Sequence, residues 1–129
     1  MKAKFLSVLL ALTMVLSLLP TAVLAKDKTV STEEELKQAI ESVSDGDTIT
    51  VSGTIEVNAP LVVTHTITLT GGSIVASNNF TSNSNQLADF NLISLKTAGK
   101  TLTLKNITLN ANGKSLVVYC NAGKVVVDG

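Results

Sequence analysis

Residues 101–112 read TLTLKNITLNAN, and two earlier stretches of the chain have nearly the same pattern. Residues 48–59 read TITVSGTIEVNA, and residues 66–77 read TITLTGGSIVAS. Each copy alternates apolar and polar residues over a short strand, turns at Gly or Asn, and begins a second strand. A unit with one apolar face per strand cannot bury that face alone, so the copies are predicted to stack on one another.

The spacing of the apolar anchors indicates where a loop interrupts the stack. Ile49 and Ile67 are 18 residues apart, whereas Ile67 and Leu102 are 35 residues apart. The longer interval contains NNFTSNSNQ (residues 78–86), a polar run without periodicity. This run predicts a polar loop insertion near residues 78–89.

A second internal match extends the repeat towards the C-terminus. Residues 92–100 (LISLKTAGK) resemble residues 116–124 (LVVYCNAGK), which lie 24 positions later. Coils of about 18 to 24 residues with two or three short strands each are typical of parallel β-helices. Residues 48–129 are therefore predicted to form such coils.

Residues 1–25 have the composition of a secretory signal peptide. Lys2 and Lys4 precede an apolar run over residues 5–19, and the segment ends in the small-residue sequence VLA. A run of about 15 residues is shorter than the roughly 20 needed for a spanning helix. We expect the segment to be removed, which predicts an extracellular or cell-surface protein that meets the membrane only through this transient signal.

The charges and the single cysteine limit the classes of partner. Beyond residue 25 the chain has eight Lys, no Arg and ten acidic residues, and no basic cluster. Nucleic acid is therefore not an expected partner. Cys120 has no second cysteine with which to form an intramolecular disulfide, and we expect a small, partly buried side chain. The alternative is a thiol that reacts or pairs with another chain.

Residues 26–47 are predicted to hold a leader, which can add an edge strand, and one amphipathic helix. Ser31 and Glu34 have the spacing of a capping box, in which each side chain accepts from the other residue's backbone amide. The helix is expected over residues 32–44. Its apolar positions recur at helical spacing on one face: Leu36, Ala39, Ile40 and Val43.

The sequence DGD at residues 45–47 is expected to end this helix. Gly46 can adopt the left-handed conformation that a helix stop often uses. Two Asp residues flanking a Gly also suggest a cation site, but a turn explains both of them without a metal.

These segments resemble a known family. Residues 30–40 (VSTEEELKQAI), residues 46–51 (GDTITV) and the strings ITLTG and LTLKNITL look like the start of a protein of the pectin-lyase-like superfamily. The resemblance covers about Val30 to Gly129. It implies an all-β fold, a right-handed parallel β-helix solenoid of about three to four coils, whose N-terminal end is capped by the helix. The superfamily includes pectate lyases, other polysaccharide-active enzymes, adhesins and surface proteins, so the resemblance indicates fold more than function.

The other end of the predicted stack has no cap. Residues 125–129 (VVVDG) read as a strand that stops within a coil, and an unpaired strand edge is a template for further pairing. We expect either that the sequence is truncated within a longer protein or that it self-associates through residues 125–127.

The resemblance implies three enzyme patterns, and none can be carried over to these residues. Elimination needs Arg or Lys with an acidic cluster, the hydrolases use grouped Asp, and the esterases use an Asp pair with Arg. Glu56 is expected to be a solvated side chain on a polar strand face, and His65 is expected at a turn. We assign no catalytic residue, metal ligand or cofactor. Four Asn residues are expected at bends: Asn58, Asn106, Asn110 and Asn112.

Sugar recognition usually employs exposed aromatic rings. Phe80 lies in the predicted insertion and is the best candidate for exposure, so Phe80, Asn79 and Asn83 are the predicted ligand contacts. Phe90 and Tyr119 join apolar strands and are expected in the core. Outward-facing Thr and Asn residues would give a flat, hydrogen-bonding surface that suits an extended polysaccharide or a cell-surface molecule.

Three functional hypotheses follow. The first is a secreted or cell-surface module that is not catalytic and serves adhesion or glycan contact. The second is the N-terminal part of a pectate-lyase-like enzyme whose active site lies beyond residue 129. The third is a spacer that holds another domain away from the cell envelope.

Overall fold

The computed structural model describes residues 24–82 and 89–129. The predicted signal peptide up to residue 23, and residues 83–88 of the predicted insertion, lie outside the described residues. The described chain forms one helix and eleven strands: β1 (Asp27–Val30), α2 (Glu33–Ser42), β2 (Asp47–Val51), β3 (Thr54–Val57), β4 (Leu61–Val63), β5 (Ile67–Thr70), β6 (Ser73–Ala76), β7 (Asn91–Leu95), β8 (Thr101–Lys105), β9 (Thr108–Asn110), β10 (Leu116–Cys120) and β11 (Lys124–Asp128).

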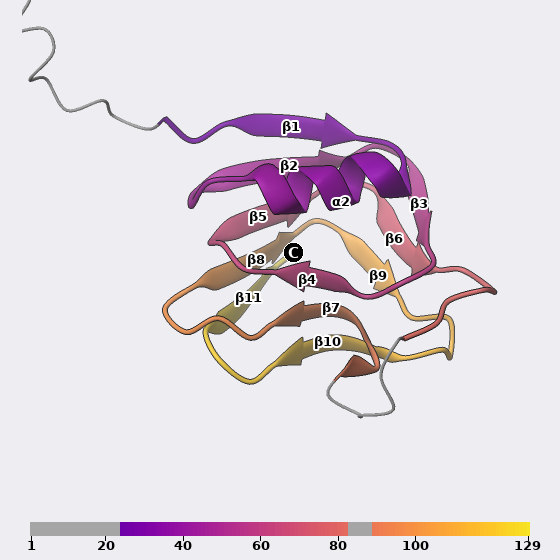
Figure 1. Cartoon of the computed structure of the whole chain (residues 1–129). Helices are drawn as coiled ribbons and strands as arrows, with labels where there is room; N and C mark the ends of the chain where they lie inside the picture. The colour runs from indigo at the N-terminus through magenta and orange to yellow at the C-terminus, as the bar shows by residue number, and fades with distance from the viewer. Residues whose placement is uncertain (1–23, 83–88) are drawn as a thin grey trace, which may run out of the picture.

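The strands form three sheets, and every described strand pair is parallel. Sheet A has the order β1-β2-β5-β8-β11, sheet B the order β3-β6-β9, and sheet C the order β10-β7-β4. From β2 onward the chain passes from sheet A to sheet B to sheet C and back to sheet A (Figure 1). Each such pass is called a coil below, and the strands of one coil pair with those of the next. The prediction of an all-β chain with parallel sheets after a single helix is confirmed for the described residues.

The core consists of aliphatic side chains stacked in register between coils. In sheet A, Ile49 pairs with Leu69 and Leu69 pairs with Leu104, and none of the three is more than 6% exposed. In sheet B, Ile55 pairs with Ile74, and both are buried. Burying such a side chain contributes about 1.5–3 kcal/mol, and this burial is possible only when the neighbouring coil is present.

Helix α2 covers the N-terminal end of the stack. It contacts β1, β2, β3 and β4, and Figure 1 shows it beside β2 and above β4. Leu36, Ala39 and Ile40 are buried on its inner face, and Val43 just after it is also buried. The predicted apolar face is confirmed, and its burial explains why this helix forms at the end of the stack.

The capping arrangement lies one residue later than predicted. Thr32, not Ser31, is the N-cap, and its hydroxyl accepts from the backbone N–H of Glu35 at 3.2 Å. A Glu35 carboxylate oxygen accepts from the backbone N–H of Ser31 at 2.8 Å, the role expected of Glu34. The shift arises because Val30 is buried as the last residue of β1, so the chain needs Ser31 to turn before the helix starts.

The helix also ends earlier than predicted, at Ser42. Val43 takes an extended conformation with ψ of 158°, and its side chain is 5% exposed in the core. Gly46 is left-handed as expected, with φ of +96°, but it turns the chain into β2 and does not cap the helix.

Asp47 is a buried acceptor for the backbone at the start of β2. Its two carboxylate oxygens accept from the N–H groups of Ser44 and Lys26, each at 2.9 Å. These hydrogen bonds hold the pKa of Asp47 below its ordinary value. The turn predicted for residues 45–47 therefore uses this carboxylate to join the helix exit to the leader.

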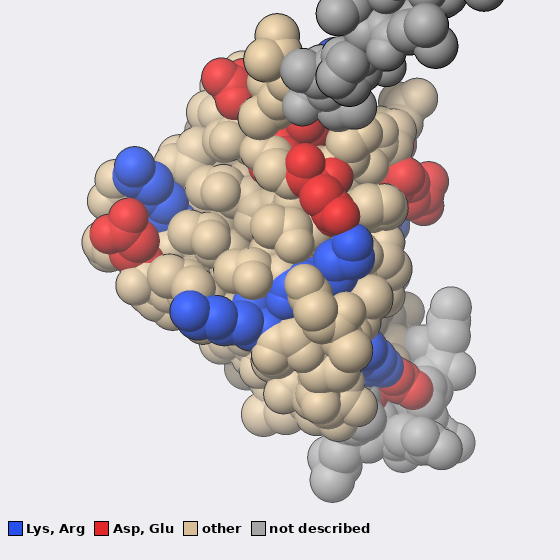
Figure 2. All heavy atoms as spheres, turned by 90° about the vertical axis from the view of Figure 1, so that its left-hand side faces the viewer, with Lys and Arg blue, Asp and Glu red and all other residues tan. Residues whose placement is uncertain are grey.

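Asp45 links corners of successive coils. Its carboxylate accepts from the Lys100 Nζ at 2.5 Å and from the backbone N–H of Thr66 at 2.8 Å, and together they lower the pKa of Asp45. The Thr66 hydroxyl in turn accepts from the N–H of Thr101 at 3.1 Å. Figure 2 shows this side of the molecule, where acidic and basic side chains are interspersed.

The lowered pKa values of Asp45 and Asp47 predict that the protein loses stability in acid. A carboxyl group whose pKa is depressed by folding stabilises the native state above its ordinary value of 3.8, and that contribution disappears as the pH falls towards the folded value. We expect the urea midpoint to fall between about pH 5 and pH 3. Asp47→Asn should lower the midpoint at pH 7 and reduce its further fall in acid.

Glu56→Gln is the control for this measurement, because Glu56 is exposed on β3, as predicted. It should have the same pH dependence as the unaltered protein. If Asp47→Asn lost as much stability in acid as the unaltered protein, the assignment of the acid sensitivity to this carboxylate would be wrong.

Burial decreases towards the C-terminal end of the stack. All five residues of β7 are buried, whereas no residue of β10 or β11 is buried. Leu116 is 54% exposed and Val127 is 74% exposed. Strands β9, β10 and β11 each pair on one side only among the described residues, so the end expected to lack a cap is exposed in this structure.

Candidate ligand-binding groove

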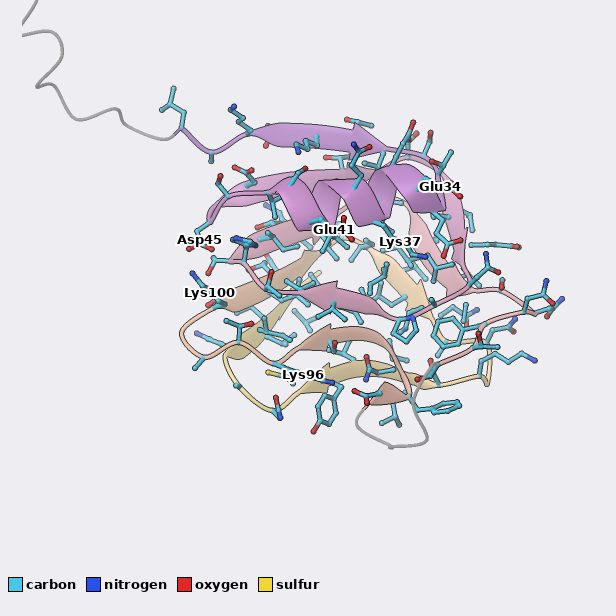
Figure 3. The ribbon with its side chains drawn as sticks, in the orientation of Figure 1. Glu34, Lys37, Glu41, Asp45, Lys96 and Lys100 are labelled. Atoms are coloured by element: carbon cyan, nitrogen blue, oxygen red, sulfur yellow. The ribbon has the colours of Figure 1, made fainter. Side chains whose placement is uncertain are left out.

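Two adjoining surface pockets lie over sheet C. The first, of about 480 Å³, lies between α2 and β4, and the second, of about 320 Å³, lies between β4 and β7. They share Ala59, Pro60 and Val62, so we treat them as one groove, called the sheet C groove. Its other principal lining residues are Lys37, Glu41, Ser94 and Lys96. In Figure 3, Lys37 and Glu41 lie above β4, and Lys96 lies below it.

A row of paired residues crosses the three strands of sheet C beside this groove. Val62 pairs with Ser94, and Ser94 pairs with Tyr119, so the three share one face of the sheet. Tyr119 is half-buried, and the Lys96 Nζ lies 5.7 Å from the centroid of its ring. Lys96 also forms an ion pair with Asp89 at 2.5 Å. The row therefore presents an apolar side chain and an aromatic ring next to a paired cation, with the buried Ser94 between them.

The helix side of the groove is held by a second ion pair. The Lys37 Nζ lies 2.7 Å from a carboxylate oxygen of Glu33. Glu33 also accepts from the backbone N–H and the side-chain amide of Asn58 at 2.8 and 2.7 Å. Partial burial raises the pKa of Glu33, but the hydrogen bonds from Lys37 and Asn58 outweigh it, so the pKa is lowered. Lys37 is thereby fixed against the coil that carries β3 and β4.

Neither Phe80 nor Asn79, two of the three predicted ligand contacts, lines this groove. Phe80 is only 7% exposed and belongs to the core, so the prediction that its ring is exposed is wrong. The Phe80 N–H donates to the Ser77 carbonyl and the Thr81 N–H donates to the Asn58 carbonyl of the preceding coil, so this segment folds back onto the stack. Asn79 is exposed, whereas Asn83 lies outside the described residues.

Phe90 and Tyr119 were expected in the core, but Phe90 is 39% exposed and Tyr119 is half-buried. The match of residues 92–100 with residues 116–124 aligns Tyr119 with the inward-facing Leu95. The observed register instead pairs Tyr119 with Ser94, one residue away. A shift by one residue moves a side chain to the opposite face of a strand, so the repeat placed Tyr119 on the wrong face.

Cys120 is exposed, which differs from the partly buried side chain that we expected. It pairs with the buried Leu95, but no further coil covers it among the described residues. Its Sγ lies 3.6 Å from the Ala122 carbonyl oxygen.

No group of three His, Cys, Asp or Glu side chains in residues 24–82 and 89–129 could hold a metal ion. His65 lies at a bend, as predicted, and its Nδ1 is 3.1 Å from the Thr64 hydroxyl. Two of the Asn residues expected at bends, Asn106 and Asn112, are left-handed, with φ of 48° and 51°.

Comparison of the chain with protein-family models, curated proteins and solved structures gives no match. In the part of the chain that the structure describes, no helix is both long enough and apolar enough to cross a membrane.

Proposed function

We propose that the chain is a right-handed parallel β-helix module, similar to the pectin-lyase-like superfamily, that is exported and contacts an extracellular glycan without cleaving it. The passage of the chain through three parallel sheets in turn supports the β-helix, as does a helix over one end. The glycan is proposed to lie in the sheet C groove. The wider role would be adhesion or contact with a cell surface.

The fold can tolerate cleavage after Ala25, which supports the proposed export. The first described element, β1, begins at Asp27, so removal of residues 1–25 leaves every described helix and strand intact. The backbone nitrogen of Lys26 lies 2.9 Å from the buried Asp47 carboxylate. Cleavage would turn this amide into an ammonium group, which makes a stronger hydrogen bond to a carboxylate than a neutral amide does.

The observation that carries the proposed glycan contact is the half-buried Tyr119 ring in the row Val62–Ser94–Tyr119. An aromatic ring on a flat sheet face offers an apolar platform for a sugar ring, and neighbouring polar groups can bond its hydroxyls. Lys96, whose Nζ lies 5.7 Å from the centroid of the Tyr119 ring, is in position to supply such a group. The groove continues from β7 across β4 to α2, so an extended polymer fits it better than a single sugar.

The proposal predicts that Tyr119→Ala weakens binding to a polysaccharide. The test is affinity electrophoresis of the purified protein through gels that contain neutral or acidic plant and microbial polysaccharides. For any polymer that retards the protein, we expect Tyr119→Ala to raise the dissociation constant at least about tenfold, since stacking area is lost. Tyr119→Phe keeps the ring and should retain most of the affinity.

Phe90→Ala is the matched control, because Phe90 is also an exposed aromatic residue but lines a different surface pocket, with Gly113 and Leu116. It should leave binding unchanged. Equal losses from Phe90→Ala and Tyr119→Ala, or no retardation by any polymer, would contradict the proposed groove. Cleavage of a bound polymer would contradict a purely binding role.

A further inference from the structure

Strand β11 (Lys124–Asp128) is an open edge of sheet A. It pairs with β8 on one side and with no other strand among the described residues. Lys124 and Asp128 at its two ends are exposed, and Val127 is 74% exposed. An open edge with an exposed valine is prone to pair with another strand, and proteins commonly protect such edges.

Two backbone hydrogen bonds at the ends of β11 show which of its backbone groups point to the open side. The Lys124 N–H donates to the Lys100 carbonyl at 2.9 Å, and the Asp128 carbonyl accepts from the Asn106 N–H at 3.1 Å. Alternate residues of a paired strand face the same neighbour, so Lys124, Val126 and Asp128 direct their backbone groups to β8. The N–H and C=O groups of Val125 and Val127 therefore point to the open side.

The side chains of β11 form a pattern that is complementary to itself. The strand reads KVVVD, with Lys124 and Asp128 at equal distances from Val126 and with opposite charges. Neither side chain forms a salt bridge in the part of the chain that the structure describes. In an antiparallel pair centred on Val126, Lys124 of one chain lies opposite Asp128 of the other, and this holds at both ends.

We propose that two copies of this chain associate through β11, which pairs with its own counterpart in the antiparallel direction about Val126. Val125 then lies opposite Val127 of the second copy, and each such pair exchanges its N–H and C=O groups as antiparallel strands do. The side chains of Val125 and Val127, which stack on Leu102 and Leu104, meet on the face that carries the core. Lys124 and Asp128 meet on the other face, where opposite charges stabilise a strand pair.

Pairing of β11 with β11 of a second copy fits this edge better than pairing with β1, the strand at the other edge of sheet A. Pairing β11 with β1 of another copy would be a head-to-tail contact, which repeats without closing. In β1 the charged residues Asp27 and Lys28 are neighbours, so the strand lacks the symmetric spacing of β11. Only the β11 pair places both charged residues opposite their complements and closes as a dimer.

The test is the association state of the purified protein, measured by sedimentation equilibrium over a range of concentrations. The unaltered chain should be a monomer–dimer system. Lys124→Asp or Asp128→Lys alone puts like charges opposite each other at both ends, and each should weaken the dimer about tenfold or more. The double variant Lys124→Asp with Asp128→Lys restores opposite charges and should recover most of the affinity.

Lys114→Asp is the matched charge control, because Lys114 is exposed between β9 and β10 and the net charge changes by the same amount as in Lys124→Asp. It should leave the dimer constant unchanged. Failure of the double variant to recover association would overturn the proposed register. A protein that stays monomeric at every concentration, or that grows into larger assemblies, would overturn the dimer itself.

Val127→Pro tests the backbone contact separately from the charges. Its N–H points to the open side, so proline there removes a bond between copies while the bonds to β8 remain. We expect loss of the dimer with an unchanged circular dichroism spectrum. Full dimerisation of this variant would exclude β11 pairing as the contact.

Discussion

Gly72→Ala is expected to destabilise the protein by about 4 kcal/mol, a large share of the roughly 5–15 kcal/mol that stabilises a typical domain. A Cβ at this position would overlap the Gly53 carbonyl oxygen and lie 2.8 Å from the Val51 carbonyl oxygen. Both obstacles are backbone atoms of the neighbouring coil, so neither can rotate away. Gly72 also has φ of +33°, which a side chain disfavours.

Urea unfolding followed by circular dichroism measures this loss, and Gly99→Ala is the matched control. Gly99 is also left-handed, with φ of +76°, but an added Cβ would meet nothing within 4 Å. Only the backbone strain applies there, so we expect a loss of about 1 kcal/mol. Similar losses at both positions would show that conformation, and not the close approach of two coils, makes Gly72 necessary.

Leu69→Ala is expected to lower the free energy of unfolding by about 3–4 kcal/mol. Leu69 is 0% exposed and lies in β5 between Ile49 on β2 and Leu104 on β8. Truncation removes buried apolar surface and leaves a cavity, because the coils on both sides are held at the spacing of the β-sheet hydrogen bonds and cannot collapse. The shortened side chain also weakens the contacts of both neighbouring coils.

Val62→Ala is the control for this prediction. It should lower the free energy of unfolding by about 0.5 kcal/mol or less. Val62 is in the middle of β4, but its side chain is on the outer face and is 53% exposed. Both variants are measured by urea unfolding at low protein concentration, so that the proposed association through β11 does not contribute. A loss at Val62 as large as that at Leu69 would contradict the assignment of the inner and outer faces.

The period of the sequence was sufficient to predict most of the elements. Ile49, Val51, Ile55 and Val57 alternate with polar residues and are all buried, as a period of two requires. Leu36, Ala39 and Ile40 recur at helical spacing and are buried on α2. These predictions were correct because each depends only on neighbours within the same segment.

The candidate site was predicted less well than the fold. Phe80 was expected to be exposed because it lies in a polar run, but the backbone bonds around it turn the ring into the core. Tyr119 was expected in the core because it joins an apolar strand, but its pairing with Ser94 puts it on the outer face. The polarity of the neighbouring residues therefore did not predict whether either ring is buried.

The sequence by itself determined that the chain stacks short strands behind one helix, and which face of each early strand is buried. These features follow from local periodicity and from turns at Gly and Asn, which act within a few residues. Only the tertiary structure decided the register of β10 on β7, the burial of Phe80 and the direction of the free backbone groups of β11. Each of these depends on contacts between different coils, where a shift of one residue reverses the face that a side chain occupies.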